Sequence, residues 1–187
     1  MSSHKTDKLY SALFLDRDGV INIRLIDNYV KKIEAFKFME GVPQAIAKLN
    51  KMFNYVFVVT NQQGIGKGLM SEKDLTDIHN YMLRELEKHD AVITEVFHCP
   101  HKQQDNSFYR KPNVGMALSA KKKYPDINFR NSVMVGDSIT DMQFGKRLKM
   151  QTVFISDNLK DRRDNYKIIN FSYPDLLSFA KDLEVFL

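Results

Sequence analysis

The chain has 187 residues, of which 43% are hydrophobic and 27% are charged, and its formal net charge is +5 at pH 7. This composition excludes a disordered chain, and no apolar stretch approaches the roughly 20 residues that cross a bilayer. The N-terminus lacks the apolar segment of a signal peptide, and the single cysteine cannot form an internal disulfide. We therefore expect one domain, residues 1–187, that is cytoplasmic and has no membrane partner. The positive charge suits an anionic substrate but is too small to indicate nucleic acid.

The first predicted strand, residues 9–15, ends in two aspartates, Asp16 and Asp18, followed by Gly19. The strand has few polar positions, so we expect it to be buried on both faces of a parallel sheet. Asp16 then lies at the carboxyl edge of the sheet, where open α/β folds bind their ligands. Two carboxylates this close repel each other unless a cation or a proton separates them. The pair therefore indicates a metal site, an acid and base pair, or both; the alternative is a solvated loop after a strand.

The second strand, residues 55–60, is β-branched and aromatic and again ends in polar residues. A glycine-rich stretch, 64–68, follows it. This stretch fails the Walker pattern, which needs glycine at Asn61 and Ser or Thr at Gly68. We therefore do not expect a nucleotide-binding P-loop, although exposed backbone amides at these glycines suit an anion. Residues 22–38, before this strand, form an irregular segment of a length that usually carries function or covers a site.

The second half of the chain repeats the pattern of strands that end in polar groups. The loop after the third strand ends in Arg110 and Lys111, a basic pair that either holds a phosphate or is simply solvated. The fourth strand stops at Asp137, and Asp141 follows on the first turn of the next helix, so the two carboxylates lie close together. Asp137 either belongs to a site at the strand end or only caps the N-terminus of this helix. The remaining predictions are strands over 92–98, 132–137, 152–155 and 168–171, helices beginning at 41–43 and spanning 71–89, 113–124, 138–148 and 174–186, and a charged loop at 157–166.

Four side chains thus follow strand ends: Asp16, Thr60, Lys111 and Asp137. In a doubly wound parallel sheet these ends face one crevice. A crevice with both signs of charge suits phosphoryl transfer, which needs cations to neutralise phosphate and a nucleophile in line. The sequence therefore predicts an α/β fold with a doubly wound parallel sheet and a phosphate-handling site.

These residues belong to stretches that resemble the four ordered motifs of the haloacid dehalogenase-like phosphohydrolases, namely 16–20, 60–61, Lys111 and 136–141. The resemblance covers about residues 9–156 and implies the Rossmann-like fold of that superfamily. The short spacing between Asp18 and Thr60 leaves no room for a large cap domain, so a capless member is expected.

The resemblance implies a role for each motif residue. Asp16 is the nucleophile that forms an aspartyl-phosphate, and Asp18 is the acid that protonates the leaving oxygen and then activates water. Mg²⁺ is bound by the side chains of Asp16 and Asp137 and by the backbone carbonyl of Asp18. Thr60 and Lys111 hold the transferring phosphoryl group.

Within the superfamily, the chain is most similar to the D-glycero-D-manno-heptose-1,7-bisphosphate 7-phosphatases and the related histidinol-phosphate phosphatases. The stretches that carry this similarity are 16–22, 28–30, 60–65, 99–101 and 110–112, and those at 28–30 and 64–68 favour the heptose group. The similarity implies a sugar-phosphate substrate from the pathway to a surface polysaccharide. The residues expected to contact it are Asn28, Tyr29, Asn61, Gln62, Gln63 and Arg110.

One departure concerns metal binding. These relatives typically hold a structural zinc with Cys-x-His and Cys-x-Cys before the Arg-Lys-Pro stretch. Here Cys99 and His101 remain, but Ser107 and Tyr109 replace the last two cysteines. Two ligands do not close a tetrahedral site, so we do not expect zinc and interpret Cys99 as a small, partly buried hydrophobic residue.

A second departure lies in the last motif. Both groups of relatives usually carry Lys or Arg after the motif aspartate, whereas this chain has Ser138. The loss of that cation leaves the identity of the substrate undecided, but it does not change the predicted chemistry. By the same resemblance, Asp141 supports Lys111 or the metal-bound waters.

Two other functions stay open. A capless crevice in a basic chain admits a strand end, as in a polynucleotide 3′-phosphatase, but an evident basic and aromatic strip is lacking. A receiver-like phospho-acceptor switch also places an aspartate cluster and a lysine at strand ends, but it needs no acid at Asp18 and keeps its aspartyl-phosphate for longer. Neither the oligomeric state nor the anomer of the sugar follows from the sequence.

Overall fold

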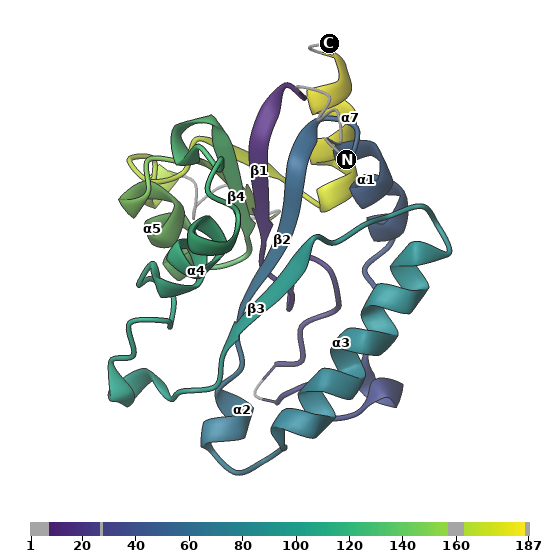
Figure 1. Ribbon diagram of the computed structural model, residues 1–187, viewed down its shortest axis with the longest axis vertical. Coiled ribbons are helices and arrows are strands. Elements are labelled where there is room, and N and C mark those ends of the chain that lie inside the picture. The colour runs from purple at the N-terminus through teal and green to yellow at the C-terminus, as the bar shows by residue number, and fades with distance from the viewer. Residues whose placement is uncertain (1–7, 27, 157–162, 186–187) are drawn as a thin grey trace.

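The apolar strands pair into one parallel sheet. The computed structural model describes residues 8–26, 28–156 and 163–185. Its six strands follow the order β3-β2-β1-β4-β5-β6 (Figure 1), and their bounds are β1 (Tyr10–Leu15), β2 (Phe53–Asn61), β3 (Glu95–Cys99), β4 (Ser132–Gly136), β5 (Gln151–Ile155) and β6 (Phe171–Tyr173). The order reverses between β1 and β4, which is where doubly wound folds bind their ligands. The predicted α/β fold with a doubly wound sheet is confirmed.

Helices cover both faces of this sheet. Those in the described ranges are α1 (Val42–Leu49), α2 (Gln63–Gly66), α3 (Glu72–Glu87), α4 (Gly115–Lys123), α5 (Ile139–Arg147) and α7 (Leu176–Val185), with short 3-10 helices at Ile33–Ala35, Gln103–Asp105 and Phe129–Asn131. Helices α1, α3 and α7 pack on one face, and α4 and α5 pack on the other (Figure 1). This layering leaves the carboxyl ends of the strands open for a site.

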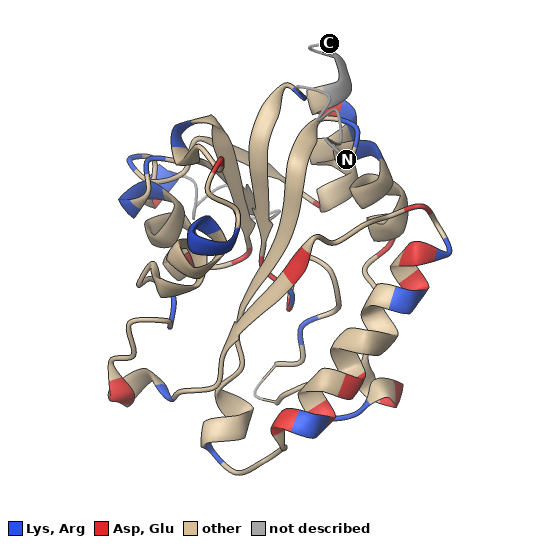
Figure 2. Cartoon of the chain, in the orientation of Figure 1, with Lys and Arg blue, Asp and Glu red and all other residues tan. Residues whose placement is uncertain are grey.

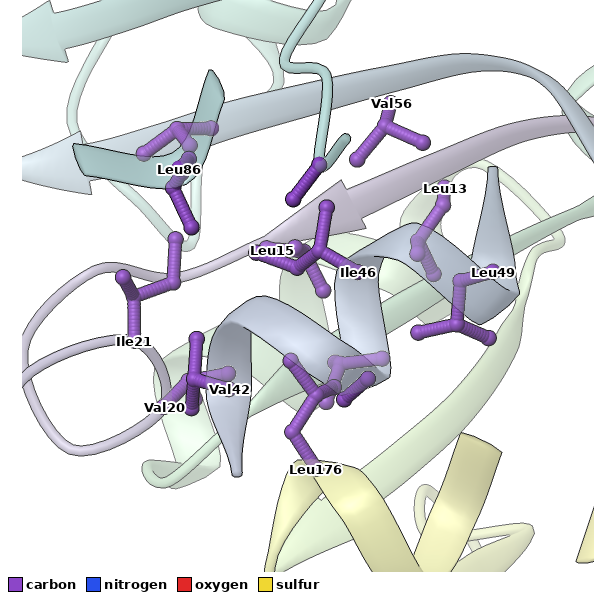
Figure 3. Packing of buried hydrophobic residues seen from close by; sticks show 14 of the residues in the cluster. Leu13, Leu15, Val20, Ile21, Val42, Ile46, Leu49, Val56, Leu86 and Leu176 are labelled. Atoms are coloured by element: carbon purple, nitrogen blue, oxygen red, sulfur yellow. The ribbon is translucent and has the colours of Figure 1, made fainter. Parts of the chain in front are cut away.

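Strand β1 shows why the sheet needs two covered faces. Leu13 and Leu15 join the cluster formed with α1, α3 and α7 (Figure 3). Ala12 and Phe14 join the opposite cluster, formed with α4 and α5. All four are fully buried, because alternate side chains of a strand point to opposite faces.

The turn after β1 is anchored to the same core. Val20 and Ile21 are fully buried in the cluster that contains Leu15 (Figure 3). The carbonyl of Arg17 accepts hydrogen bonds from the amides of Ile21 and Asn22 at 2.8 and 3.1 Å. Apolar burial and backbone bonding therefore fix the segment that carries Asp16 and Asp18.

Two strands begin later than predicted. Residue 92 is held outside β3 because the Asn50 side chain bonds both its amide and its carbonyl, at 2.7 and 2.9 Å. Likewise, Thr152 accepts the amide of Asn170 and donates to the carbonyl of Ile168, so β6 begins only at Phe171. Side-chain hydrogen bonds thus hold the chain at both places, and at Asn170 they accompany a backbone bond to the carbonyl of Thr152 at 3.2 Å.

The segment between β1 and α1 is long and mostly irregular. Between Asp18 and α1, the described residues contain one 3-10 helix, Ile33–Ala35, and the buried side chains of Val30 and Phe36 tie this segment to the core.

Most of the charged loop predicted at 157–166 lies outside the described residues. No helix in the described ranges has the length and apolarity to cross a membrane.

Candidate active site

The predicted strand-end residues meet in one cavity. Asp16 follows β1, Thr60 lies near the end of β2, Asp137 follows β4, and Lys111 comes from the connection between β3 and α4. All four line a cavity of about 790 Å³, together with Asp18. This volume lies within the range of small-molecule sites. The sheet therefore brings the motif residues together as the doubly wound topology predicts.

Lys111 is held between two carboxylates. Its Nζ lies 2.9 Å from Oδ1 of Asp16 and 2.6 Å from Oδ1 of Asp141, and its side chain is only 2% exposed. Burial alone would lower the pKa of Lys111, but the carboxylates of Asp141 and Asp16 raise it above its ordinary value. The lysine is therefore a fixed positive charge beside Asp16.

Helix α5 positions the second of these carboxylates. Oδ2 of Asp141 accepts hydrogen bonds from the backbone amide and the hydroxyl of Ser138, at 3.1 and 2.6 Å. This arrangement caps the N-terminus of the helix while the other oxygen pairs with Lys111. Asp141 contacts Lys111, one of the two roles that the resemblance implied for it, and Ser138 serves the helix cap.

Three carboxylates form a cluster that fits a divalent cation. One oxygen each from Asp16, Asp137 and Asp141 lies within 4.8 Å of the others. Burial and the charges of Asp141 and Asp137 outweigh Lys111 and raise the pKa of Asp16 to about 7. Burial also raises the pKa of Asp137, against the opposing effect of Arg24. Oδ1 of Asp137 is buried without a hydrogen-bond partner among the described residues, and carboxylate oxygens are ligands that Mg²⁺ prefers.

Gly19 makes room for this cluster. Its φ of +91° lies in the left-handed region, and a Cβ at this position would come within 1.9 Å of Oδ2 of Asp137. Glycine is therefore required here both by the backbone conformation and by the close approach of the carboxylate.

Asp18 is held by three side chains. Nη2 of Arg17 lies 3.0 Å from both carboxylate oxygens, and the amides of Asn22 and Gln62 donate at 2.9 and 2.8 Å. Burial alone would raise the pKa of Asp18, but the Arg17 guanidinium and these hydrogen bonds lower it below its ordinary value. Sequence reasoning missed Arg17 and Asn22, because nothing in their spacing indicates which way their side chains point.

Gln62 does not occupy the place that the sequence predicted. We expected it to contact substrate, but it is 1% exposed and lies outside the cavity lining. Its amide donates to Asp18 and to Oγ1 of Thr60, at 2.8 and 2.9 Å. The side chain points beneath the cavity and supports two motif residues.

The other residues expected to contact substrate line the outer cavity. They are Asn28, Tyr29, Asn61, Gln63 and Arg110. Oδ1 of Asn61 accepts a hydrogen bond from the backbone amide of Lys111 at 3.0 Å, and Nδ2 of Asn61 donates to the carbonyl of Lys111 at 3.2 Å. Asn61 therefore also fixes the position of this lysine.

Two cations in the outer cavity were not singled out from the sequence. Nζ of Lys67 and the amide of Gln63 donate to the hydroxyl of Tyr29, at 2.9 and 3.0 Å. Arg24 forms an ion pair with Oδ2 of Asp137 at 3.0 Å. Both cations lie in irregular segments, where no periodicity places a side chain.

The loop that lacks two of the zinc ligands is held by hydrogen bonds. Cys99 is fully buried, with its Sγ 3.8 Å from Oγ of Ser107. Asn113 donates to the carbonyl of Ser107 at 2.9 Å and accepts from Arg147 at 2.8 Å. Cys99 is therefore buried more deeply than the partly buried position that the sequence predicted.

Comparisons with known proteins agree with this site. The model of the family described as polynucleotide kinase 3 phosphatase matches residues 13–185. The chain belongs to this family of haloacid dehalogenase-like phosphatases. It is 36% identical to a D-glycero-alpha-D-manno-heptose-1,7-bisphosphate 7-phosphatase from Campylobacter jejuni, over 93% of this chain and 98% of the relative. A D-glycero-beta-D-manno-heptose-1,7-bisphosphate 7-phosphatase from Rhodopseudomonas palustris is 39% identical over 72% of this chain and 77% of its own length.

A solved structure extends the likeness to the fold. The D,D-heptose 1,7-bisphosphate phosphatase of B. bronchiseptica, complexed with magnesium and phosphate, superimposes with a TM-score of 0.83 and 29% identity. The match covers 95% of this chain and 99% of that structure. The protein is a phosphoric monoester hydrolase of the group that contains the heptose-1,7-bisphosphate 7-phosphatases.

Proposed function

We propose that the protein is a Mg²⁺-dependent phosphatase that removes the 7-phosphate of D-glycero-D-manno-heptose 1,7-bisphosphate. The observation that carries the proposal is the placement of Asp16, Asp18, Asp137 and Lys111 in one cavity of a chain whose relatives hold this activity over nearly its whole length. The full chain would act as one domain in the cytoplasm. Relatives of both anomeric specificities occur, so the proposal includes both anomers.

The chemistry assigns two steps to two aspartates. A carboxylate oxygen of Asp16 attacks phosphorus, and Asp18 protonates the sugar oxygen as it leaves. Because Arg17 and the hydrogen bonds keep the pKa of Asp18 low in the free enzyme, Asp18 must take up that proton when the phosphate monoester binds. Asp18 then takes a proton from a water molecule that attacks the aspartyl-phosphate, which releases inorganic phosphate and restores Asp16. Lys111 and Thr60 hold the phosphoryl oxygens during both steps.

Mg²⁺ would be held by the carboxylates of Asp16 and Asp137 and, as the resemblance implies, by the backbone carbonyl of Asp18. Bound there, the ion neutralises negative charge on the transferring phosphoryl group. The buried Oδ1 of Asp137, which has no hydrogen-bond partner among the described residues, supports this assignment.

The outer cavity suits the rest of a bisphosphorylated sugar. Among the lining residues, Lys67 and Arg110 donate to neutral oxygens, the hydroxyl of Tyr29 and the carbonyl of His101. These cations are available for the distal phosphate. Asn28 and Gln63 line the same cavity and would contact the sugar hydroxyls. The hydrogen bond to the Tyr29 hydroxyl holds Nζ of Lys67 at the cavity lining.

A substrate panel tests the proposal. We expect the highest kcat/KM with one anomer of the heptose bisphosphate, a lower value with histidinol phosphate, and no activity in the Asp16→Asn variant. An equal or higher kcat/KM with histidinol phosphate would refute the proposed substrate. Wild-type activity in Asp16→Asn would refute the assignment of Asp16 as the nucleophile.

A polynucleotide 3′-phosphatase is the second candidate, because the description of the matching family model names that activity. Against it, α3 carries five acidic residues and only two basic ones, Lys73 and Arg84, so it offers no basic strip (Figure 2). A 3′-phosphorylated oligonucleotide in the same panel decides: hydrolysis that exceeds that of the sugar and falls steeply with salt would favour this candidate. A receiver-like switch is distinguished by an aspartyl-phosphate that outlives a single turnover.

A further inference from the structure

A fully buried arginine separates the two motif aspartates. Arg17 is 0% exposed and is the largest side chain in the described core. Its Nη2 binds both oxygens of Asp18 at 3.0 Å. Its other terminal nitrogen, Nη1, lies 3.3 Å from Nε2 of His79. The planar guanidinium therefore links Asp18 to helix α3.

The chemistry of this contact fixes the state of His79. A guanidinium only donates hydrogen bonds, so Nε2 must supply a lone pair, and a neutral ring then carries its proton on Nδ1. Burial, the Arg17 charge and His98 lower the pKa of His79 to about 3, in agreement with a neutral ring. His79 is thus an acceptor that adds no charge to the pair of Arg17 and Asp18.

The geometry gives this acceptor a mechanical role. A guanidinium is a rigid fork, so fixing Nη1 also fixes the direction of Nη2. Nη2 is the group that holds the Asp18 carboxylate. His79 lies on the second turn of α3, a helix anchored in the core through Leu75 and Ile78. The rigid helix therefore sets the direction of the acid and base through two hydrogen-bonded contacts.

We propose that His79 is a positioning residue for phosphoryl transfer, which acts through Arg17 to orient the Asp18 carboxylate toward the leaving oxygen and the attacking water. The inference rests on the proposed chemistry at Asp16 and Asp18. It adds a residue outside the cavity lining, on a helix that provides none of the four motifs.

The test compares two substitutions at His79. His79→Leu removes the acceptor, whereas His79→Gln keeps a carbonyl oxygen that Arg17 can reach. We expect His79→Leu to lower kcat for the heptose bisphosphate by about 10- to 100-fold and to leave KM unchanged. The loss is smaller than the whole contribution of acid and base catalysis, because Asp18 itself is still present. His79→Gln should recover most of this loss. The control is His98→Gln, because His98 packs against His79 with ring centroids 6.1 Å apart but pairs with Glu72.

A second substrate, the aryl ester 4-nitrophenyl phosphate, separates positioning from folding. Its nitrophenolate group leaves without a proton, so His79→Leu should release the first equivalent at the wild-type rate. The later turnovers should be slow, because water activation still needs Asp18. A fold defect would slow both phases equally.

Several results would overturn the inference: equal losses in the Leu and Gln variants, a loss confined to KM, or a slow first turnover of the aryl ester. If His79→Leu fails to fold, His79→Asn replaces it, since its shorter amide does not reach Arg17. A wild-type enzyme that hydrolyses the aryl ester but not the heptose bisphosphate would refute only the proposed substrate, and the same variants would then be compared on another alkyl monoester.

Discussion

Substitution of Asp141 by Asn probes the buried ion pair beside the nucleophile. Asp141 is fully buried and its Oδ1 lies 2.6 Å from Nζ of Lys111. Removing one partner of a buried pair costs about 3–5 kcal/mol. Lys111 keeps Asp16 at 2.9 Å, so we expect the lower end, about 3 kcal/mol. For a domain of this size the loss corresponds to a Tm lower by about 6–12 °C.

Urea unfolding without Mg²⁺ measures this loss. Ser138→Ala is the matched control, because it removes the hydroxyl that donates to Oδ2 of Asp141 and leaves the ion pair intact. We expect that variant to lose about 1 kcal/mol, the usual cost of a helix cap. If Asp141→Asn were no less stable than Ser138→Ala, the ion pair would not stabilise the site as argued.

Three further predictions concern the metal and the distal phosphate. Gly19→Ala should weaken Mg²⁺ binding in calorimetry, because its Cβ would displace Asp137, whereas Gly68→Ala has a similar φ of +69° with open space and should leave that affinity unchanged. Since Mg²⁺ needs the deprotonated carboxylate and the metal-free pKa of Asp16 is about 7, apparent Mg²⁺ affinity should rise about tenfold from pH 6 to pH 8; a flat profile would contradict this. Lys67→Met should raise KM for the bisphosphate about tenfold and leave KM for the aryl ester unchanged, and equal effects on both substrates would argue against a distal phosphate site.

The positions of the motif residues were predictable from the sequence because strand ends are marked by composition. Apolar runs that stop at Asp16 and Asp137 define the sheet edge, and parallel topology brings such ends together. The position of Lys111 followed from the same topology, although the sequence alone also allowed a solvated basic pair.

What the sequence did not reveal was the direction of individual side chains. Gln62 stands between two cavity residues, Asn61 and Gln63, yet it points beneath the cavity. The pair of Arg17 and His79 joins positions 62 residues apart, and a fully buried arginine contradicts the usual preference of that residue for the surface. Such contacts depend on tertiary packing, which leaves no local pattern.

The central claim is that Asp16 carries the phosphoryl group during turnover. Quenching the enzyme during hydrolysis of the heptose bisphosphate and reducing it with borohydride should convert the aspartyl-phosphate to homoserine, detectable by peptide mass spectrometry. We expect homoserine at position 16 and at no other aspartate. Steady phosphate release with an unmodified Asp16, or with the label on another residue, would contradict it.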